Sequence, residues 1–488
     1  MREPLFVSRK GLRKEENSGK MVKNGTQKGM SDLRAVKPDK NELFETMPVP
    51  KALAKMAIPT VVSQLITLIY NIADTWFIGQ TDDPYMVAAS SLVLTVFFMT
   101  TALANLFGVG GGSLVVRLLG GREEEEARKV ASVSLVMAGG AALAFSLLCL
   151  IFMDPLLYLL GASGNTIGYA RQYLLFVVVL GGFPTVLSNT MSAMLRNAGY
   201  SKEAGFGLGM GGILNVVLDP LFMFVLLPDG YEVIGAAAAT MLSNCVAFAY
   251  FIIVYLKVQD ECILALPWQI EKIQSKSMQS IFSVGVPSAM TTLLYDLTNM
   301  VINRLSSSHG DIELAAMGIV LKVERLPQNI GIGICLGMMP LAAYNYASKN
   351  HKRMNSFFKA SLAAGLGVAL SCVVLYRLFA PTILQAFITD AETVRYGTAF
   401  LKARCFASPV MFLSFHMVHF MQAIDRGKCS FWLAVIRQIC LNIPILFLMN
   451  HFFGMDGIIW TQLVADAINS VISYIFYGRE MRKLRLAP

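Results

Sequence analysis

The chain has 488 residues, of which 55% are hydrophobic and only 15% are charged, and its mean hydropathy is +0.56. A soluble protein carries roughly 25% charged residues, so these totals exclude a soluble globular protein. The net charge is +9, but the basic residues fall in alternate loops and not on one soluble face, which argues against a nucleic-acid-binding protein.

The first fifty residues are polar and mixed in charge, with no pattern of a cleavable signal peptide. We expect residues 1–50 to form a disordered cytoplasmic tail. The eight cysteines include no C-x-x-C pair, so we expect neither a zinc site nor a disulfide framework.

From residue 52 onward, the apolar residues come in blocks of about 20, the length that spans a bilayer as a helix. These blocks predict an all-α polytopic membrane protein with twelve transmembrane helices. The predicted spans are 52–78, 86–110, 128–152, 165–194, 203–227, 233–257, 280–305, 313–338, 355–379, 394–420, 429–450 and 455–477.

Lys and Arg gather in the loops that follow the even-numbered spans, and in the tail after span twelve. The intervening loops are poor in basic residues and often acidic, as at Thr81-Asp82-Asp83 and Pro228-Asp229-Gly230. By the positive-inside rule, both termini are predicted to be cytoplasmic.

The first span carries a polar stripe that ends in a carboxylate. Its members recur at spacings of four, three, four and three residues, which places them on one face of a helix. Because a carboxylate is costly in hydrocarbon, we expect this face to turn toward an internal cavity. The stripe consists of Thr60, Gln64, Thr67, Asn71 and Asp74.

The two halves of the chain repeat at an offset of 226–228 residues, since Pro59 matches Pro287 and Gly110 matches Gly337. The first-span stripe maps onto Ser288, Thr292, Tyr295 and Asn299. Six spans followed by six of the same design predict two parallel six-helix lobes with pseudo-two-fold symmetry. The predicted parts are a lobe at 51–258, a cytoplasmic linker at 259–279, a lobe at 280–480 and a tail at 481–488.

The acids of the first half have no counterpart in the second. Asp74 corresponds to Ile302, and the span-five pair Asn215 and Asp219 corresponds to a stretch with Asn442 but no acid. Burial and a neighbouring carboxylate both favour the protonated form of a carboxyl group, so such a pair suits proton coupling. Asn189 and Thr240 would complete a polar cluster, or they form ordinary helix–helix hydrogen bonds.

The second half has charged residues of its own. Each of them could line a cleft between the lobes, or pair internally, for instance Lys322 or Arg325 with Glu324 or Asp296. They are Asp296, Lys322, Glu324, Arg325, Arg404 and Asp466. His416 and His419 lie three residues apart without a third ligand, so we favour packing or cavity lining over a metal site. No Walker A, G-x-S-x-G or H-E-x-x-H motif is present, so we expect neither ATP hydrolysis nor another enzyme activity.

At these residues the sequence resembles the multidrug and toxic compound extrusion (MATE) transporters, in particular the bacterial branch of staphylococcal-type multidrug export proteins and DNA-damage-inducible relatives. The resemblance covers about 50–480. It is carried by IPTVVSQLITLIYNIADTWFIG at 58–79, GVGGGSLVVRLLGG at 108–121, LRNAGYSK at 195–202 and ILNVVLDPLFMF at 213–224.

The resemblance implies a monomeric exporter in a bacterial plasma membrane, which exchanges organic, often cationic, compounds for H⁺ or Na⁺ without a cofactor. It implies a cation site at Asp74, Asn215 and Asp219, which Na⁺ could occupy, and matches Asn189 and Thr240 less closely. A second cation site, known in another branch, is in doubt because span ten has Arg404 and no acid. The expected substrate-contacting residues are Gln64, Thr67, Tyr70, Asn71, Thr292, Tyr295, Asp296 and Asn299.

Two other functions stay open at this point. A lipid-linked saccharide flippase of the same superfamily would need cationic side chains in the cleft to hold pyrophosphate, and Lys322, Arg325 and Arg404 are candidates. A membrane-embedded enzyme would need a catalytic set, which the sequence lacks.

Overall fold

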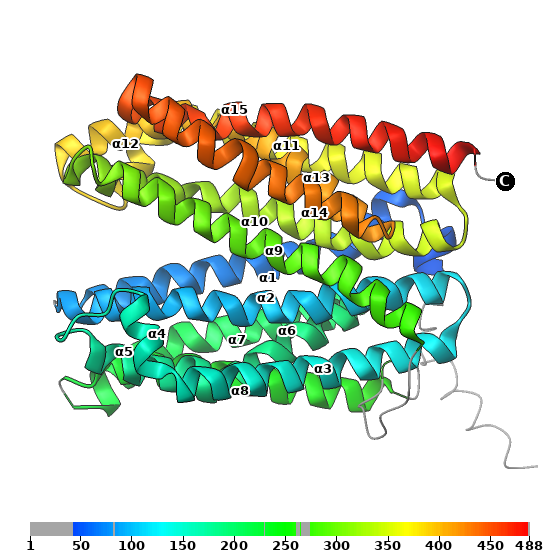
Figure 1. Ribbon diagram of the computed structural model, residues 1–488, viewed down its shortest axis with the longest axis horizontal. Coiled ribbons are helices and arrows are strands. Elements are labelled where there is room, and N and C mark those ends of the chain that lie inside the picture. Colours follow the sequence, from blue (N-terminus) through cyan, green and yellow to red (C-terminus); the bar gives the residue numbers. More distant parts are fainter. Residues whose placement is uncertain (1–41, 82, 229, 260–263, 265–273, 487–488) are drawn as a thin grey trace, which may run out of the picture.

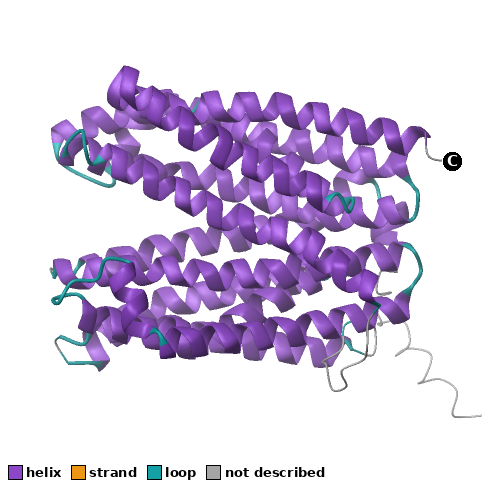
Figure 2. Cartoon of the chain, in the orientation of Figure 1, coloured by secondary structure: helices purple, strands orange, loops and turns teal. Residues whose placement is uncertain are grey.

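The computed structural model describes residues 42–81, 83–228, 230–259, 264 and 274–486. The described part of the chain is helical and contains no strand (Figure 2). Most of the predicted tail, at 1–41, and most of the predicted linker, at 260–263 and 265–273, lie outside the described residues.

The helices form two lobes that lie side by side, one below and one above in Figure 1. The amino-terminal lobe contains α1 (Val49–Gly79), α2 (Pro84–Gly120), α3 (Glu124–Ile151), α4 (Met153–Leu159), α5 (Ile167–Leu174), η2 (Leu175–Leu180), α6 (Gly182–Asn197), α7 (Ser201–Leu221), η3 (Phe222–Leu226) and α8 (Glu232–Val258). The carboxyl-terminal lobe contains α9 (Ser275–Ser306), α10 (Asp311–Ala347), α11 (His351–Gln385), α12 (Ala391–Arg404), α13 (Ala407–Ala423), α14 (Gly427–Val435), η4 (Ile436–Asn442) and α15 (Ile443–Leu486).

Eight helices of the described part are long and apolar enough to cross a membrane, or nine if the bent pair Ile167–Leu180 and Gly182–Asn197 is one span. The predicted spans seven and ten, now α9 and α12–α13, are too polar or too short to meet the same criterion. Spans eleven and twelve run together in α14–α15, with a break at Gly454, whose φ is 58°. The twelve predicted spans therefore each have a helical counterpart.

The predicted tail ends earlier than expected. Residues 42–50 belong to the fold, as the short helix η1 (Glu42–Thr46) and the start of α1. Phe44 stacks on Tyr344 with ring centroids 4.8 Å apart, and its carbonyl accepts hydrogen bonds from Arg353 Nε at 2.8 Å and Asn345 Nδ2 at 3.1 Å. The polar composition of residues 1–50 as a whole does not predict this folded segment. Its apolar residues, including Leu43 and Phe44, are buried.

The lobes meet most closely at the end of the molecule where α1 begins and α15 ends, which we call the terminal end (Figure 1). There α2 crosses α9, and a Cβ added to Gly285 would stand 2.0 Å from the carbonyl oxygen of Leu106. Arg117 bridges the lobes too, at 2.9 Å from Asp425 and 2.8 Å from Ser280. Glycine is required at position 285 because only a residue without a side chain allows this approach.

Candidate functional site

A cavity of about 380 Å³ lies between the lobes, and eight helices contribute to its wall. Helices α1, α2, α6, α7 and α8 supply one side, and α9, α10 and α13 supply the other. Most of its polar groups are neutral amides and hydroxyls, and aromatic side chains such as Phe97, Phe98 and Phe415 are interspersed among them. Such a wall can hold an organic molecule by apolar contact and a few hydrogen bonds.

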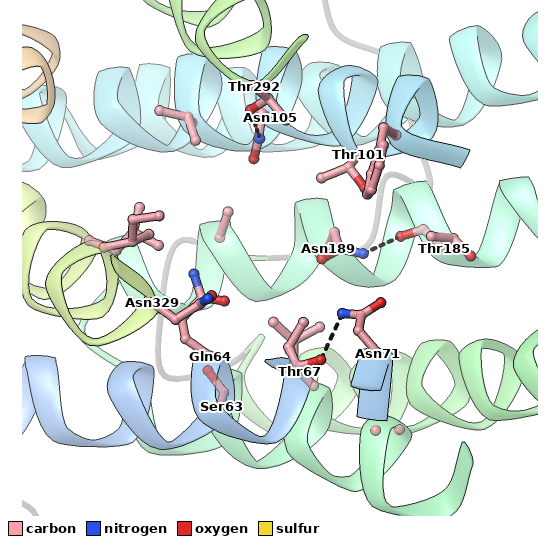
Figure 3. Close-up of a pocket in the computed structure, with 18 of the residues that line it drawn as sticks. Ser63, Gln64, Thr67, Asn71, Thr101, Asn105, Thr185, Asn189, Thr292 and Asn329 are labelled. Atoms are coloured by element: carbon pink, nitrogen blue, oxygen red, sulfur yellow. Dashed lines mark hydrogen bonds between the residues drawn. The ribbon is translucent and has the colours of Figure 1, made fainter. Parts of the chain in front are cut away.

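The first-span stripe faces this cavity over most of its length (Figure 3). Gln64, Thr67 and Asn71 line the wall, and Asn71 Nδ2 donates a hydrogen bond of 2.7 Å to the carbonyl of Thr67. Thr60 does not reach the cavity; it is buried against α7, with its hydroxyl 3.2 Å from that of Ser201. The stripe turns away at its start because α1 packs closely against α7 near the terminal end.

Of the thirteen predicted site residues, ten lie on the wall of this one cavity. They are Gln64, Thr67, Tyr70, Asn71, Asn189, Asn215, Thr240, Thr292, Tyr295 and Asp296. The other three, Asp74, Asp219 and Asn299, are not part of the wall. Asn299 is partly buried, one turn of α9 beyond the lining residues Tyr295 and Asp296.

The prediction that Asp74 faces the cavity is therefore wrong. Its carboxyl lies one turn of α1 beyond Tyr70 and Asn71, inside the amino-terminal lobe, where it is hydrogen-bonded by Tyr173 of α5 and lies near Asp219. The helix carries the carboxylate past the cavity and into the lobe interior.

Asp219 is fully buried and belongs to a chain of hydrogen bonds behind the cavity wall. Asn215 Nδ2 lies 3.1 Å from Asp219 Oδ1 and 3.2 Å from the Thr240 hydroxyl, so one amide joins α7 to α8. We call Asp74, Asn215, Asp219 and Thr240 the amino-lobe cluster.

Three buried oxygen atoms of the amino-lobe cluster have unsatisfied hydrogen-bonding capacity. Asp74 Oδ1, Asn215 Oδ1 and Asp219 Oδ2 are buried and have no hydrogen-bond partner among the described residues. Neither carboxylate forms an ion pair with a described cation. Buried oxygens of this kind are costly unless a proton or cation satisfies them, and an all-oxygen set suits a hard cation such as Na⁺.

The carboxyl-terminal lobe balances its buried acids internally. Arg404 Nε lies 2.9 Å from Glu324 Oε2, and Arg437 Nε lies 2.5 Å from Asp466 Oδ1. None of these four residues lines the cavity. Of the internal pairings left open for Lys322 and Arg325, the one with Glu324 is not formed, because Arg404 of α12 occupies that place and Lys322 is exposed. Arg325 does lie near enough to Asp296 to interact with it electrostatically.

One hydrogen bond shows how the two lobes correspond. Asn442 Nδ2 lies 3.2 Å from Gln462 Oε1, and it links span eleven to span twelve as Asn215 links span five to span six. At the position four residues after Asn442, however, the buried residue is Leu446, where the first lobe has Asp219. At this position of the repeated scaffold, a buried acid therefore occurs in the first lobe only.

The sequence analysis missed two functional candidates, Arg196 and Arg437. Arg196 lines the cavity, and Arg437 lies over the ring of Phe415 at 4.3 Å from its centroid, just behind the wall. Arg437 lies inside an apolar predicted span, and a charged residue in such a span indicates a candidate functional position. Arg196 falls just after predicted span four, where the sequence pattern indicates a basic loop, and the structure makes it the residue before the last of α6. No group of three or more His, Cys, Asp or Glu side chains that could hold a metal occurs among the described residues.

Two lobes of membrane helices around a shared polar cavity define a polytopic membrane transporter. The MatE family model matches residues 59–221 and 287–448, once in each lobe. The chain therefore belongs to the MATE family, a family of transporters.

Two multidrug export proteins are similar in sequence to this chain over nearly its whole length. The multidrug export protein MepA of Staphylococcus aureus is 30% identical over 427 residues, which cover 87% of this chain and 92% of that protein. MepA of Staphylococcus haemolyticus is 30% identical over 440 residues, or 90% of this chain and 96% of that one.

A solved structure described as an outward-facing conformation of a multidrug resistance MATE family transporter matches with a TM-score of 0.86 at 22% identity, over 92% of this chain and 99% of that chain. The MATE transporter VcmN of Vibrio cholerae, solved as a mutant, matches with a TM-score of 0.83 at 20% identity, over 89% and 97%. The predicted all-α, two-lobed membrane fold is confirmed.

Proposed function

We propose that this protein is a secondary active multidrug exporter, which moves organic and often cationic compounds out of the cell in exchange for H⁺ or Na⁺. The relatives of known name are multidrug export proteins, and they share nearly the full length of the chain. We further propose that it works as a monomer without a cofactor in a bacterial plasma membrane, with lipid and small organic molecules as its partners.

The observation that carries the proposal is the set of three buried, unpartnered oxygens in the amino-lobe cluster. A proton on Asp74 or Asp219, or a Na⁺ held by both with Asn215, would satisfy them. The cluster adjoins the cavity through Tyr70, Asn71, Asn215 and Thr240, which belong to its wall. A change in the charge of the cluster is therefore felt directly by a molecule in the cavity.

The orientation follows from the positive-inside rule, by which the terminal end is cytoplasmic. The lobes touch through Gly285 and Arg117 near that end, so we assign this conformation to the outward-facing state. Alternating access then requires the α2–α9 contact to open while the lobes close at the other end. Cation binding at the amino-lobe cluster is the proposed trigger.

The substrate site, in this proposal, is the cavity itself. Asp296 supplies a negative charge from the second lobe, Phe97, Phe98 and Phe415 supply aromatic faces, and the amides supply adaptable hydrogen bonds. The flippase alternative has less support, because its candidate cations Lys322, Arg325 and Arg404 do not line the cavity, and Arg196 is the only Lys or Arg among the described lining residues.

The proposal is tested with Asp74→Asn in energised membrane vesicles. We expect this variant to lose both drug resistance in cells and drug-induced release of protons from vesicles, since the asparagine cannot carry a proton or a negative charge. Asp154→Asn, which alters an exposed carboxylate paired with Arg171, serves as the control and should keep both activities. Full retention of both activities by Asp74→Asn rules out the assigned coupling role.

A further inference from the structure

Among the residues that the structure describes, the cavity wall carries one fixed positive charge and one fixed negative charge. Among the described residues that line it, Arg196 of α6 and Asp296 of α9 are the only Arg, Lys, Asp or Glu. Asp296 faces the cavity from the carboxyl-terminal lobe and Arg196 from the amino-terminal lobe. Neither comes within ion-pair distance of a residue that the structure describes, although Arg325 is near enough to Asp296 to interact with it electrostatically.

Arg196 needs an anion or water beside it. A guanidinium keeps its charge under all physiological conditions, and a half-buried charge without a partner is costly in a membrane protein. All five of its N–H donors are free of described side-chain hydrogen bonds, whereas Arg404 and Arg437 in the other lobe are fixed by carboxylates. Arg196 thus differs from them in being open to the cavity.

His419 of α13 lies on the same wall, close enough to Arg196 to interact with it electrostatically. Its Nδ1 lies 2.8 Å from the carbonyl oxygen of Phe415, so Nδ1 carries a proton and donates it. The other ring nitrogen, Nε2, remains available to a ligand. In the neutral ring Nε2 can only accept a hydrogen bond, so His419 assists an anion only when the ring is protonated and Nε2 also donates.

The two charges stand at different depths. Arg196 and His419 lie within about one turn of the terminal ends of α6 and α13. The turn after α13 is level with Ser280 of α9, since Asp425 Oδ1 lies 3.3 Å from its hydroxyl. Asp296 follows Ser280 by sixteen residues of helix, which is roughly 24 Å of rise. Because His419 precedes Asp425 by only six residues, Arg196 and His419 lie nearer the terminal end of the cavity, and Asp296 lies farther from that end.

We infer that Arg196, assisted by His419, is an anion subsite, and that the cavity takes amphoteric drugs whose carboxylate sits on Arg196 while their amine points toward Asp296. A planar carboxylate matches the two-pronged guanidinium, which gives short charge-assisted hydrogen bonds. The aromatic body of such a molecule would lie along the amides and phenylalanines between the two charges. This inference rests on the proposed function, because it takes the cavity as the drug site.

The test uses two forms of one dye: the rhodamine that bears two free amino groups and a benzoic acid, and its methyl ester. The ester keeps the cationic body and loses only the carboxylate. Binding to purified protein in detergent is followed by fluorescence anisotropy. We expect Arg196→Gln to weaken binding of the acid by about tenfold or more and to change binding of the ester less than about threefold. Arg196→Lys, which keeps the charge but not the fork, should recover part of the loss.

Matched variants keep the result interpretable. Asp296→Asn should weaken both dyes, because both carry the cationic body, and Lys322→Gln removes an exposed charge away from the cavity and should change neither. Normal ester binding by Arg196→Gln shows that the cavity is intact. Equal losses for acid and ester, an undiminished affinity for the acid, or no binding of the acid by the wild type would each overturn the inference. Because binding is measured without a gradient, a failure of antiport would leave this result readable.

Discussion

Gly285→Ala tests the contact on which the two lobes close at the terminal end. An alanine Cβ would lie 2.0 Å from the Leu106 carbonyl oxygen and 2.9 Å from its carbonyl carbon, whereas Cβ atoms in proteins essentially never come within 3.0 Å of another atom. Helices α2 and α9 must therefore move apart by about 1 Å, because a backbone carbonyl within a helix cannot swing aside. Overpacking of this kind costs about 1–3 kcal/mol, which shifts a two-state equilibrium roughly 5- to 150-fold.

The clash shifts the conformational equilibrium in one direction, because it exists only while the lobes touch at the terminal end. We expect Gly285→Ala to populate the state that is open at the terminal end. Spin labels at Glu124→Cys and Lys352→Cys, one on each lobe at that end, would report it as a longer component in the distance distribution. The control is Gly367→Ala, since a Cβ at Gly367 meets nothing within 4 Å. A distance distribution and transport rate identical to those of Gly367→Ala would refute the reasoning.

Two further predictions concern stability. Arg404→Met leaves Glu324 buried without its partner and should lower the free energy of unfolding by about 3–5 kcal/mol. Adding Glu324→Leu to this variant should recover most of that loss. If Arg404→Met were as stable as the wild type in detergent, this prediction would be contradicted. Phe44→Ala removes the ring that stacks on Tyr344 and should weaken the packing of η1 by about 3 kcal/mol. The Met47 amide donates a hydrogen bond of 2.8 Å to the Glu42 carbonyl, so its hydrogen exchange should become faster in this variant. Glu42→Ala is the exposed control, and unchanged exchange in Phe44→Ala would show that the ring does not hold η1.

The cavity could be predicted from the sequence where helical periodicity alone decides the geometry. The spacing of Gln64, Thr67 and Asn71 fixes one helix face, and the internal repeat transfers that face to Thr292 and Tyr295. Both sets lie on the wall, because repeated spans occupy matching positions in the two lobes. Periodicity could not say how far along each helix the cavity extends, which is why Thr60, Asp74 and Asn299 fall outside it.

The pairing of the buried charges could not be predicted, because partners come from distant spans. Arg404 reaches Glu324 across 80 residues, and Arg437 meets Asp466 across 29. Charge alone does not show which acid each arginine will meet once the helices pack. It is this pairing, however, that separates the two lobes: Glu324 and Asp466 of the second are balanced by arginines, whereas Asp74 and Asp219 of the first have no described cationic partner.

The measurement that tests the account most directly is transport into proteoliposomes under separately imposed pH and Na⁺ gradients, with a fluorescent organic cation as substrate. We predict that one of the two gradients, without ATP, drives uptake of the cation by the wild type, that Asp74→Asn and Asp219→Asn each abolish this uptake, and that both variants still bind the cation. Gradient-driven uptake by either variant at the wild-type rate would contradict the claim that the unpaired oxygens of the amino-lobe cluster couple the ion to the drug.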